Sequence, residues 1–379
     1  MRTLALILFV LILAAGTWGV YRTPSALPAP GELQLTALPP HDGTGPALVA
    51  IQPWMDERHY QSETHLRERL DAYLLAAAGA GYLTGGTVVV FPEHVGTWLV
   101  AARAPRASFS AGTTRGAMIH LIAANPLPFA LALPGSPETD RFAAAVFRMR
   151  ARRMAHAYHN VFASLAQRHG VTIVAGSIVL PDPAVENGRL IARDGPLYNT
   201  SAVFAPDGSI HPHLVRKVHP IPEEAGFTAA AQASALPVFD TPAGRLGVLI
   251  CADSWHPDVY AVLAEAGTDL VAVPAFLQPS GIWSAPWGGY TTGWPQDVDR
   301  GEAGRLTEGE AWMRHALAGR LGRAGARHGA TAFLRGDLWD LGSDGVNILV
   351  DGSGARLAGQ PGGASVSVLP LSAAGASSE

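Results

Sequence analysis

Three residues of reactive type follow or interrupt apolar runs of the sequence. Glu93 comes after residues 87–91 (TVVVF) and a proline, Lys217 lies within HLVRKVHPIPEE, and Cys251 follows residues 246–250 (LGVLI). Each has a simpler explanation by itself: a solvated carboxylate, a lysine that faces solvent, and a buried, inert thiol. Together they supply a nucleophile, a base that can take its proton and a cation that can stabilise negative charge. Their combination therefore predicts nucleophilic catalysis by a cysteine.

These three residues must be positioned by alternating strands and helices. We expect strands at residues 47–52, 87–91, 171–176, 246–250, 269–274, 331–334 and 346–350, and helices at residues 65–78, 141–169, 257–266 and 308–328. Residues 198–204 and 210–218 should form a hairpin around Pro206-Asp207-Gly208. This pattern predicts one layered α/β domain with mixed sheets. Catalytic side chains in such folds gather at strand ends and in the loops that follow them.

The order of the motifs resembles that of the carbon–nitrogen hydrolase (nitrilase) superfamily, whose members carry a Glu–Lys–Cys triad. The matching motifs are VVVFPE around Glu93, RKVH around Lys217 and GVLICADSWHP around Cys251. YNTSAVFAPDGS is similar to the family's hairpin before the lysine strand, and NILVDGSGARLA to its closing strand and turn. The resemblance extends over residues 47–360 and implies a nitrilase-like α-β-β-α sandwich. One departure is a long helical stretch between Glu93 and Lys217, larger than a compact member needs.

The resemblance implies covalent catalysis by Cys251. Lys217 would favour the Cys251 thiolate, and Glu93 would accept the proton as sulfur attacks an electrophilic carbon. Lys217 and a backbone N–H would stabilise the tetrahedral intermediate, and a thioester would form as the amine leaves. The family often carries a second glutamate after the lysine. Glu224 is the preferred candidate for it, and Glu223 is nearly as good.

Other residues near the motifs are candidates for substrate binding. They are His94, Trp255 and Phe276. A cluster of aromatic residues in a Gly/Pro-rich loop forms either a lid over an apolar substrate or a packed surface loop. The cluster contains Trp283, Trp287, Tyr290 and Trp294. His156 and His159 lie one helical turn apart but lack a further ligand at a familiar spacing. We therefore expect neither a metal ion nor a cofactor.

Cleavage of a non-peptide carbon–nitrogen bond in a small-molecule amide, or less readily a nitrile, is the leading functional hypothesis. N-acyl transfer is the alternative, because KVHPIPEE is similar to the Lys-x-His-x-x-Pro-x-x-Glu loop of apolipoprotein N-acyltransferase, although one residue shorter. That family carries a membrane domain of several spans, whereas this sequence has one candidate span. A third hypothesis, a catalytically silent binding protein, predicts loss of a triad residue, and all three are present.

The N-terminal residues have the composition of a membrane segment. Residues 3–21 contain no charge, and Trp18 and Tyr21 lie near their end, where amphipathic rings favour the membrane interface. We expect a single-pass transmembrane helix here, with a cleaved signal peptide as the alternative. The catalytic domain would then lie at the membrane on its extracytoplasmic side. The predicted divisions are an anchor or signal at 1–22, a Pro-rich stalk at 23–46, the hydrolase domain at 47–360 and a flexible tail at 361–379.

The composition excludes several other classes of protein. Lys and Arg number 27 against 31 Asp and Glu, so the net charge of −4 offers no electrostatic basis for nucleic-acid binding. A hydrophobic content of 48% excludes a largely disordered chain, and a single cysteine excludes an intramolecular disulfide. The partners that we expect are a small-molecule substrate and the membrane. A homo-oligomer is also compatible with the sequence.

Overall fold

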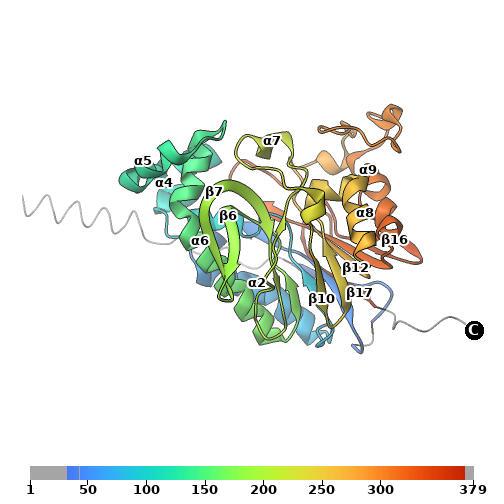
Figure 1. The fold of residues 1–379 in the computed structure, drawn as a ribbon. Helices are drawn as coiled ribbons and strands as arrows, with labels where there is room; N and C mark the ends of the chain where they lie inside the picture. Colours follow the sequence, from blue (N-terminus) through green and yellow to red (C-terminus); the bar gives the residue numbers. More distant parts are fainter. Residues whose placement is uncertain (1–31, 42, 372–379) are drawn as a thin grey trace, which may run out of the picture.

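Two six-stranded mixed sheets lie at the centre of the molecule (Figure 1). The structure is a computed structural model that describes residues 32–41 and 43–371. The first sheet has the order β1 (Leu33–Ala37), β17 (Ala364–Pro370), β2 (Ala47–Gln52), β4 (Val88–Val90), β5 (Thr172–Val174) and β8 (Val203–Phe204). The second has the order β10 (Val238–Thr241), β11 (Gly244–Val248), β12 (Leu270–Ala275), β13 (His328–Phe333), β15 (Ile348–Asp351) and β16 (Gly354–Leu357).

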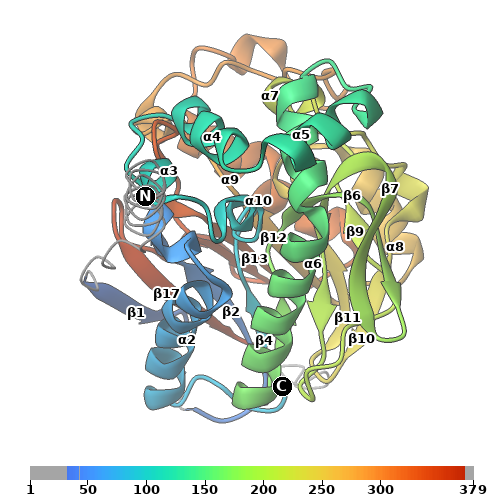
Figure 2. The same ribbon diagram turned by 90° about the vertical axis from the view of Figure 1, so that its left-hand side faces the viewer.

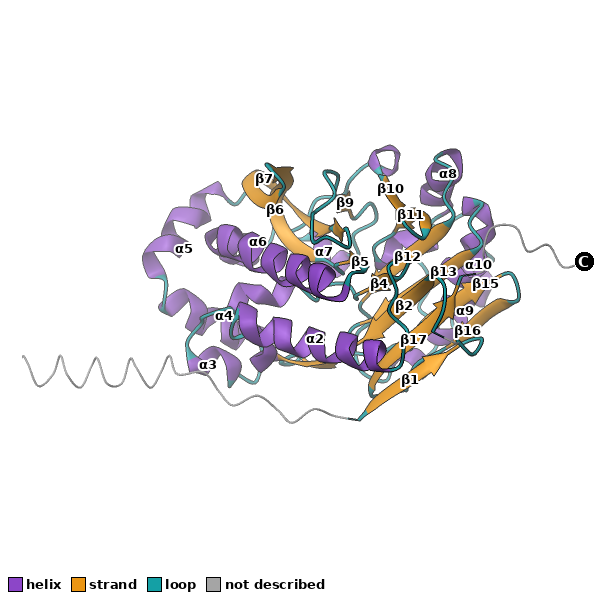
Figure 3. Cartoon of the chain, turned by 90° about the horizontal axis from the view of Figure 1, so that it is seen from below, coloured by secondary structure: helices purple, strands orange, loops and turns teal. Residues whose placement is uncertain are grey.

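Helices cover the outer faces of the sheets (Figure 3). The α-helices are α2 (Glu63–Gly79), α3 (Arg106–Phe109), α4 (Thr114–Ala123), α5 (Pro126–Ala132), α6 (Arg141–His169), α7 (Pro222–Ala225), α8 (Pro257–Glu265), α9 (Glu308–His315) and α10 (Leu317–Arg320). Two smaller sheets pair β3 (Trp54–Asp56) with β14 (Arg335–Asp337), and place β7 (Arg189–Ser201) between β6 (Ile178–Glu186) and β9 (Val215–Arg216). The expected α-β-β-α sandwich with mixed sheets is confirmed.

The two faces of β2 belong to two different hydrophobic cores. Ala47, Val49 and Ile51 face the core that α2 and α6 cover, whereas Leu48 and Ala50 face the core between the sheets. All five side chains are fully buried. Because successive side chains of a strand point to opposite faces, a strand buried on both faces appears in the sequence as an unbroken apolar run. The pattern of β2 therefore predicts its position correctly.

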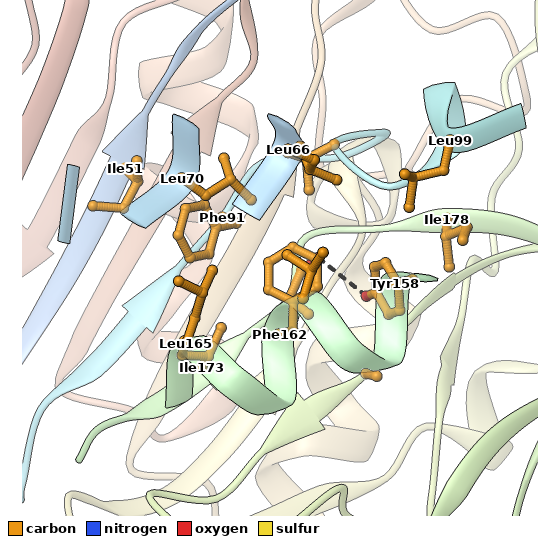
Figure 4. Packing of buried hydrophobic residues seen from close by; sticks show 14 of the residues in the cluster. Ile51, Leu66, Leu70, Phe91, Leu99, Tyr158, Phe162, Leu165, Ile173 and Ile178 are labelled. Atoms are coloured by element: carbon orange, nitrogen blue, oxygen red, sulfur yellow. Dashed lines mark hydrogen bonds between the residues drawn. The ribbon is translucent and has the colours of Figure 1, made fainter. Parts of the chain in front are cut away.

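The outer core of the first sheet is built from long side chains of α2 and α6 (Figure 4). Leu66 and Leu70 of α2 and Phe162 of α6 are fully buried there. The ring of Phe91 meets that of Phe162 nearly edge-on, with 5.5 Å between the centroids. This contact holds the chain immediately after β4, where Glu93 follows Phe91 by two residues.

Helices pack on the second sheet at positions where glycine replaces a side chain. A Cβ atom at Gly247 of β11 would lie 2.9 Å from the methyl groups of Leu263 on α8. A Cβ atom at Gly329 of β13 would lie 3.0 Å from Leu317 of α10. Both distances are shorter than ordinary van der Waals contact, so the two glycines allow these helices to approach the sheet closely.

The helix expected at residues 308–328 is wrong in its length. α9 ends at His315 because Ala316 adopts an extended conformation (φ −91°, ψ −153°), and α10 is a short separate helix. A 3-10 turn follows, and β13 already begins at His328. Glycines at 319, 322 and 325 lower the helix propensity of this stretch, and a Cβ atom at Gly319 would lie 1.9 Å from the Arg314 carbonyl oxygen.

The expected stalk and tail both contain strands of the first sheet. β1 lies within residues 23–46, and β17 lies within residues 361–379, where a flexible tail was predicted. β17 pairs antiparallel with β2, with Val366 opposite Ile51, and parallel with β1. These strands are held by residues hundreds of positions away along the chain, and such pairing leaves no local pattern. The predicted hairpin is also incomplete, because the main partner of β7 is β6.

Helices α3, α4 and α5 form an insertion between β4 and α6 that the sequence analysis did not predict as helical. Figures 1 and 3 both show α5 at one end of the molecule, away from the two sheets. Within the described residues no single helix has the length and hydropathy for a membrane span, although the bent pair Thr114–Ala123 and Pro126–Gly135 meets the criterion jointly. The transmembrane helix predicted at residues 3–21 lies outside the described residues.

Candidate active site

Lys217 joins two buried carboxylates. It follows β9, and its Nζ donates to Glu93 Oε1 at 2.7 Å and also to Glu224 Oε2 on α7. All three residues are at most 5% exposed. Burial disfavours the ammonium form, but the charges of Glu224 and Glu93 outweigh it and raise the pKa of Lys217 well above its usual value. Lys217 therefore stays charged.

Glu224, and not Glu223, is the second glutamate beside the ammonium. Glu223, the residue before it on α7, is exposed. Burial opposes ionisation of Glu224, but the Lys217 charge and the hydrogen bond from His94 lower its pKa well below the usual range. The Lys217 ammonium and the two carboxyl groups therefore form one buried hydrogen-bonded network.

Asn199, near the end of β7, is a member of this network that the sequence analysis missed. Its Nδ2 donates to Glu93 Oε1 at 2.9 Å and to Glu224 Oε1 at 2.7 Å. The amide thus orients both carboxylates toward the shared ammonium. The only signal was its place in YNTSAVFAPDGS. Asn199 is fully buried, so the folded chain does not present its Asn-x-Ser sequence for glycosylation.

Cys251 begins a sharp turn, which Leu249 and Ile250 separate from the end of β11. Its backbone adopts the left-handed conformation (φ 49°), which costs energy for a non-glycine residue and persists where the surroundings enforce it. The side chain is 7% exposed, and its Sγ lies 3.9 Å from the carbonyl oxygen of Phe276. Ser254 Oγ donates to the carbonyl oxygen of Cys251 at 2.7 Å and closes the turn.

The electrostatic surroundings of Cys251 differ from the expectation. Burial raises the pKa of the thiol, the charge of Glu93 raises it further, and Lys217 lowers it by less than these two together. The net pKa is well above that of a free cysteine. The charge of Lys217 thus favours the thiolate, as predicted, but burial and the charge of Glu93 outweigh its effect. In the resting state the proton stays on sulfur, with a carboxylate nearby to receive it.

Asp253 fixes the Cys251 turn to the lysine segment. Its Oδ1 accepts hydrogen bonds from the backbone N–H groups of Val218 and His219 at 2.9 and 2.7 Å, and its Oδ2 accepts one from Ile250 at 3.1 Å. The side chain is completely buried, and burial raises its pKa to about 7 against the opposing charge of Lys217. Asp253 lies in the cysteine motif, but nothing in the local pattern reveals that it binds the residue after Lys217.

Two of the three predicted substrate-binding residues lie beside the network. His94 Nε2 is 3.0 Å from Glu224 Oε1, and its Nδ1 is 2.9 Å from Thr97 Oγ1. The ring of His94 meets the ring of Phe276 nearly edge-on, with 6.1 Å between the centroids. Phe276 follows β12 and also supplies the carbonyl oxygen near the Cys251 thiol.

Trp255, the third predicted residue, belongs to a packed aromatic cluster. Its ring contacts are with Trp287, Tyr290 and Trp312, and the Tyr290 hydroxyl donates to its carbonyl oxygen at 3.0 Å. Trp287 is only 3% exposed. The Trp-rich loop is therefore packed onto the Cys251 turn through Trp255.

Side-chain atoms of Glu93, His94 and Glu224 lie within 4.8 Å of one another, which is close enough for a metal ion. The Lys217 ammonium already binds both carboxylates. A divalent cation would have to displace the Lys217 ammonium from both carboxylates.

Comparisons with known proteins agree with this geometry. The model of the carbon–nitrogen hydrolase family matches residues 47–291, and the chain belongs to that family. Members of this family are described as carbon–nitrogen hydrolases.

Individual relatives match shorter segments. A deaminated glutathione amidase of Synechocystis is 32% identical over 136 residues, which are 33% of this chain and 46% of the relative. An omega-amidase of Danio rerio is 32% identical over 131 residues, which are 32% of this chain and 42% of the relative. The chain thus aligns with less than half the length of these curated relatives.

A solved structure of an amidase from Nesterenkonia sp. AN1 in complex with acrylamide has the same fold. Its TM-score is 0.51 at 16% identity, with 89% of this chain and 94% of that chain covered.

Proposed function

We propose that the protein is a thiol amidase that cleaves a small-molecule amide, with Cys251 as nucleophile, Glu93 as general base and acid, and Lys217 as oxyanion stabiliser. The observation that supports this most is the single ammonium shared by two buried carboxylates beside the only cysteine. The curated relatives named above are amidases, which favours an amide over a nitrile.

The first half of the reaction forms a thioester. As Sγ of Cys251 bonds to the carbonyl carbon, its proton passes to Glu93, so the thiolate exists only as attack begins. The negative charge that develops on the carbonyl oxygen is stabilised by Lys217. Collapse of the tetrahedral intermediate breaks the carbon–nitrogen bond, and the proton on Glu93 leaves with the amine.

In the second half of the reaction the acyl group is released. Glu93 takes a proton from water, and the hydroxide attacks the thioester carbonyl carbon. The carbon–sulfur bond breaks, the carboxylic acid departs, and the proton returns to Cys251. If an amine enters in place of water, the same steps transfer the acyl group, which is the alternative N-acyltransferase reaction.

Glu224 and Asn199 act through the other residues in this proposal. Glu224 balances the Lys217 charge and binds His94 on its other oxygen. Asn199 holds Glu93 where it receives the Cys251 proton.

Release of ammonia and carboxylic acid from a panel of primary amides tests the proposal. We expect turnover with wild-type protein and none with Cys251→Ala. Turnover by Cys251→Ala at the wild-type rate would refute it. Adding amine acceptors to the same assay separates the two reactions, because a transferase forms the new amide faster than the free acid.

We further propose that residues 3–21 anchor the chain in a membrane with the catalytic domain on the extracytoplasmic side. The uncharged stretch with aromatic residues near its end supports this. Carbonate extraction of membrane fractions should leave the full-length chain in the pellet. A soluble product that begins near Thr17 or Val20 would instead show a cleaved signal peptide.

A further inference from the structure

The most exposed apolar side chains of the described residues are concentrated in one part of the molecule. Leu131 is 74% exposed, Leu127 68%, Phe142 62% and Ile119 58%, and every other large apolar side chain in the described ranges is less exposed. They lie on α4, α5 and the first turn of α6, which are close together in the fold (Figure 2). We call the face that they form the α4–α5 face.

The helices that carry the α4–α5 face are packed against one another. Phe129 of α5 is 9% exposed and stacks on Phe142 at 5.9 Å between the ring centroids. Arg141 at the start of α6 donates from Nε to the carbonyl oxygen of Ser136 at 3.1 Å. Leu127 and Leu131 are four residues apart on α5 and therefore point outward together. Their exposure is thus built into packed helices and does not come from an unfolded loop.

The charge of this region is opposite to that of the chain as a whole. Residues 95–169 contain nine arginines and only two acidic residues, Glu138 and Asp140, whereas the whole chain has a net charge of −4. Both acids are already engaged: Glu138 pairs with Arg148, and Asp140 caps α6 by accepting from the N–H of Ala143. The acids of residues 95–169 therefore neutralise only part of the positive charge of this segment, although Arg168 at the far end of α6 also pairs with Asp71 of α2.

Six of the arginines are exposed and have no carboxylate partner among the described residues. They are Arg103, Arg106, Arg115, Arg141, Arg152 and Arg153. A cavity of about 840 Å³ lies in this region. Arg103, Arg152 and Arg153 of this set line it, and so do Asn125 and Pro128 at the start of α5. Glu63 is the only acidic residue that lines the cavity.

We propose that the α4–α5 face docks on the surface of a lipid bilayer that contains anionic phospholipids. Exposed leucine and phenylalanine side chains beside arginines are the composition of helices that lie in the membrane interface, with the apolar groups among the acyl chains and the cations at the headgroups. A protein partner or a second copy would need its own acidic, apolar surface. Exposed arginines lie on α4 and α6 as well, so two copies of this face would bring like charges together.

Docking here would place the membrane against an insertion that also contacts the active site. Thr114, at the start of α4, donates from its N–H and its Oγ1 to Asp340 Oδ1 at 2.8 and 3.0 Å. The neighbouring Trp339 donates from Nε1 to the carbonyl oxygen of Ser108 at 2.8 Å, and its ring contacts that of Trp98 at 5.8 Å. Trp98 in turn contacts the ring of His94. The insertion is thus connected to the site by a continuous chain of contacts.

The test measures how deeply one residue of the face enters the bilayer. In the full chain with Cys251→Ser, which removes the native thiol, Leu131→Cys is labelled with an environment-sensitive fluorophore. Leu357→Cys on β16 and Leu75→Cys on α2, each 48% exposed in the native chain, are the matched controls. Because the label reports its own surroundings, a membrane anchor elsewhere in the chain does not produce the signal.

With vesicles of phosphatidylcholine and phosphatidylglycerol, we expect a blue shift of the Leu131→Cys label and several-fold quenching by brominated lipid. The control labels should change little. The response should weaken several-fold in pure phosphatidylcholine, and also when Arg152→Gln and Arg153→Gln are added. A water-like label in all vesicles, or an equal response at the control sites, would overturn the proposal. So would a shift that grows with protein concentration without vesicles, because it would show a second copy on the face.

Discussion

Lys217 Nζ lies 2.7 Å from Glu93 Oε1, and both side chains are almost completely removed from water. Breaking the pair should therefore destabilise the fold, apart from the catalytic role that we propose for it. A buried charge that loses its partner costs far more than an exposed one, because neither water nor another cation replaces the interaction. The same ammonium also serves Glu224, so a change at Lys217 affects three residues at once.

Lys217→Met should lower the free energy of unfolding as well as abolish activity. It leaves two buried carboxylates without a cation, and we expect a loss of about 3–5 kcal/mol. Urea denaturation followed by circular dichroism measures it. Adding Glu93→Gln and Glu224→Gln to the same chain should recover much of the loss, since the buried charges are then removed. Stability equal to wild type in the single variant would show that the network is not buried in solution.

Glu93→Gln should reduce turnover by about 10²–10⁴-fold, because it removes the base but keeps the size of the side chain. It should also make Cys251 easier to alkylate at lower pH, because the charge of Glu93 raises the pKa of the thiol. The rate of iodoacetamide labelling as a function of pH checks this. An unchanged labelling profile together with unchanged turnover would place Glu93 outside the site.

Asn199→Asp should lower activity sharply without a change in size. The amide donates to both carboxylates, whereas an aspartate would place a third negative charge beside them. Asn160→Asp on the surface of α6 is the control and should keep wild-type activity. If the two variants show equal activity, Asn199 does not orient Glu93.

The sequence predicts the three residues of the proposed triad but not the buried residues that hold them in position. Glu93, Lys217 and Cys251 could be found because each stands at the edge of an apolar strand with a local motif. Asn199 and Asp253 could not be assigned, because their roles arise from contacts with residues distant in the chain. The high pKa of the Cys251 thiol could not be predicted for a similar reason: the sequence shows the neighbouring charges but not the depth of burial.

The fold shows the same division between local and distant information. The strands buried on both faces are recognisable from their composition, whereas β17 depends on pairing with β2 and β1 and has the composition of a flexible tail. Helices α4 and α5 carry apolar residues on their exposed side, which obscures the amphipathic pattern by which helices are usually recognised.

His256 should make the protein less stable in mild acid. Its pKa is lowered to about 4, chiefly by burial and further by the neighbouring His219, against about 6.5 in an unfolded chain. The stability that depends on the neutral ring is fully present above pH 6.5 and is lost as the pH falls toward 4. Each such histidine contributes a slope of up to about 1.4 kcal/mol per pH unit.

Chemical denaturation between pH 7 and pH 4 measures this slope, and His256→Gln should flatten it. The flattening should be partial, because burial also lowers the pKa of His59 to about 4. His213→Gln, at an exposed position, is the control and should leave the slope unchanged. An unaltered slope in His256→Gln would mean that the ring is accessible to solvent.

Intact-mass spectrometry of the protein during turnover tests the central claim most directly. When wild-type protein is mixed with a panel of amides and quenched in acid, we predict an added mass equal to the acyl group of the substrate that is turned over. The added mass should map to the peptide that contains Cys251 and should be absent from Cys251→Ala. Turnover that proceeds in Cys251→Ala, or an acyl group that maps to any other residue, would contradict the assignment of Cys251 as the nucleophile.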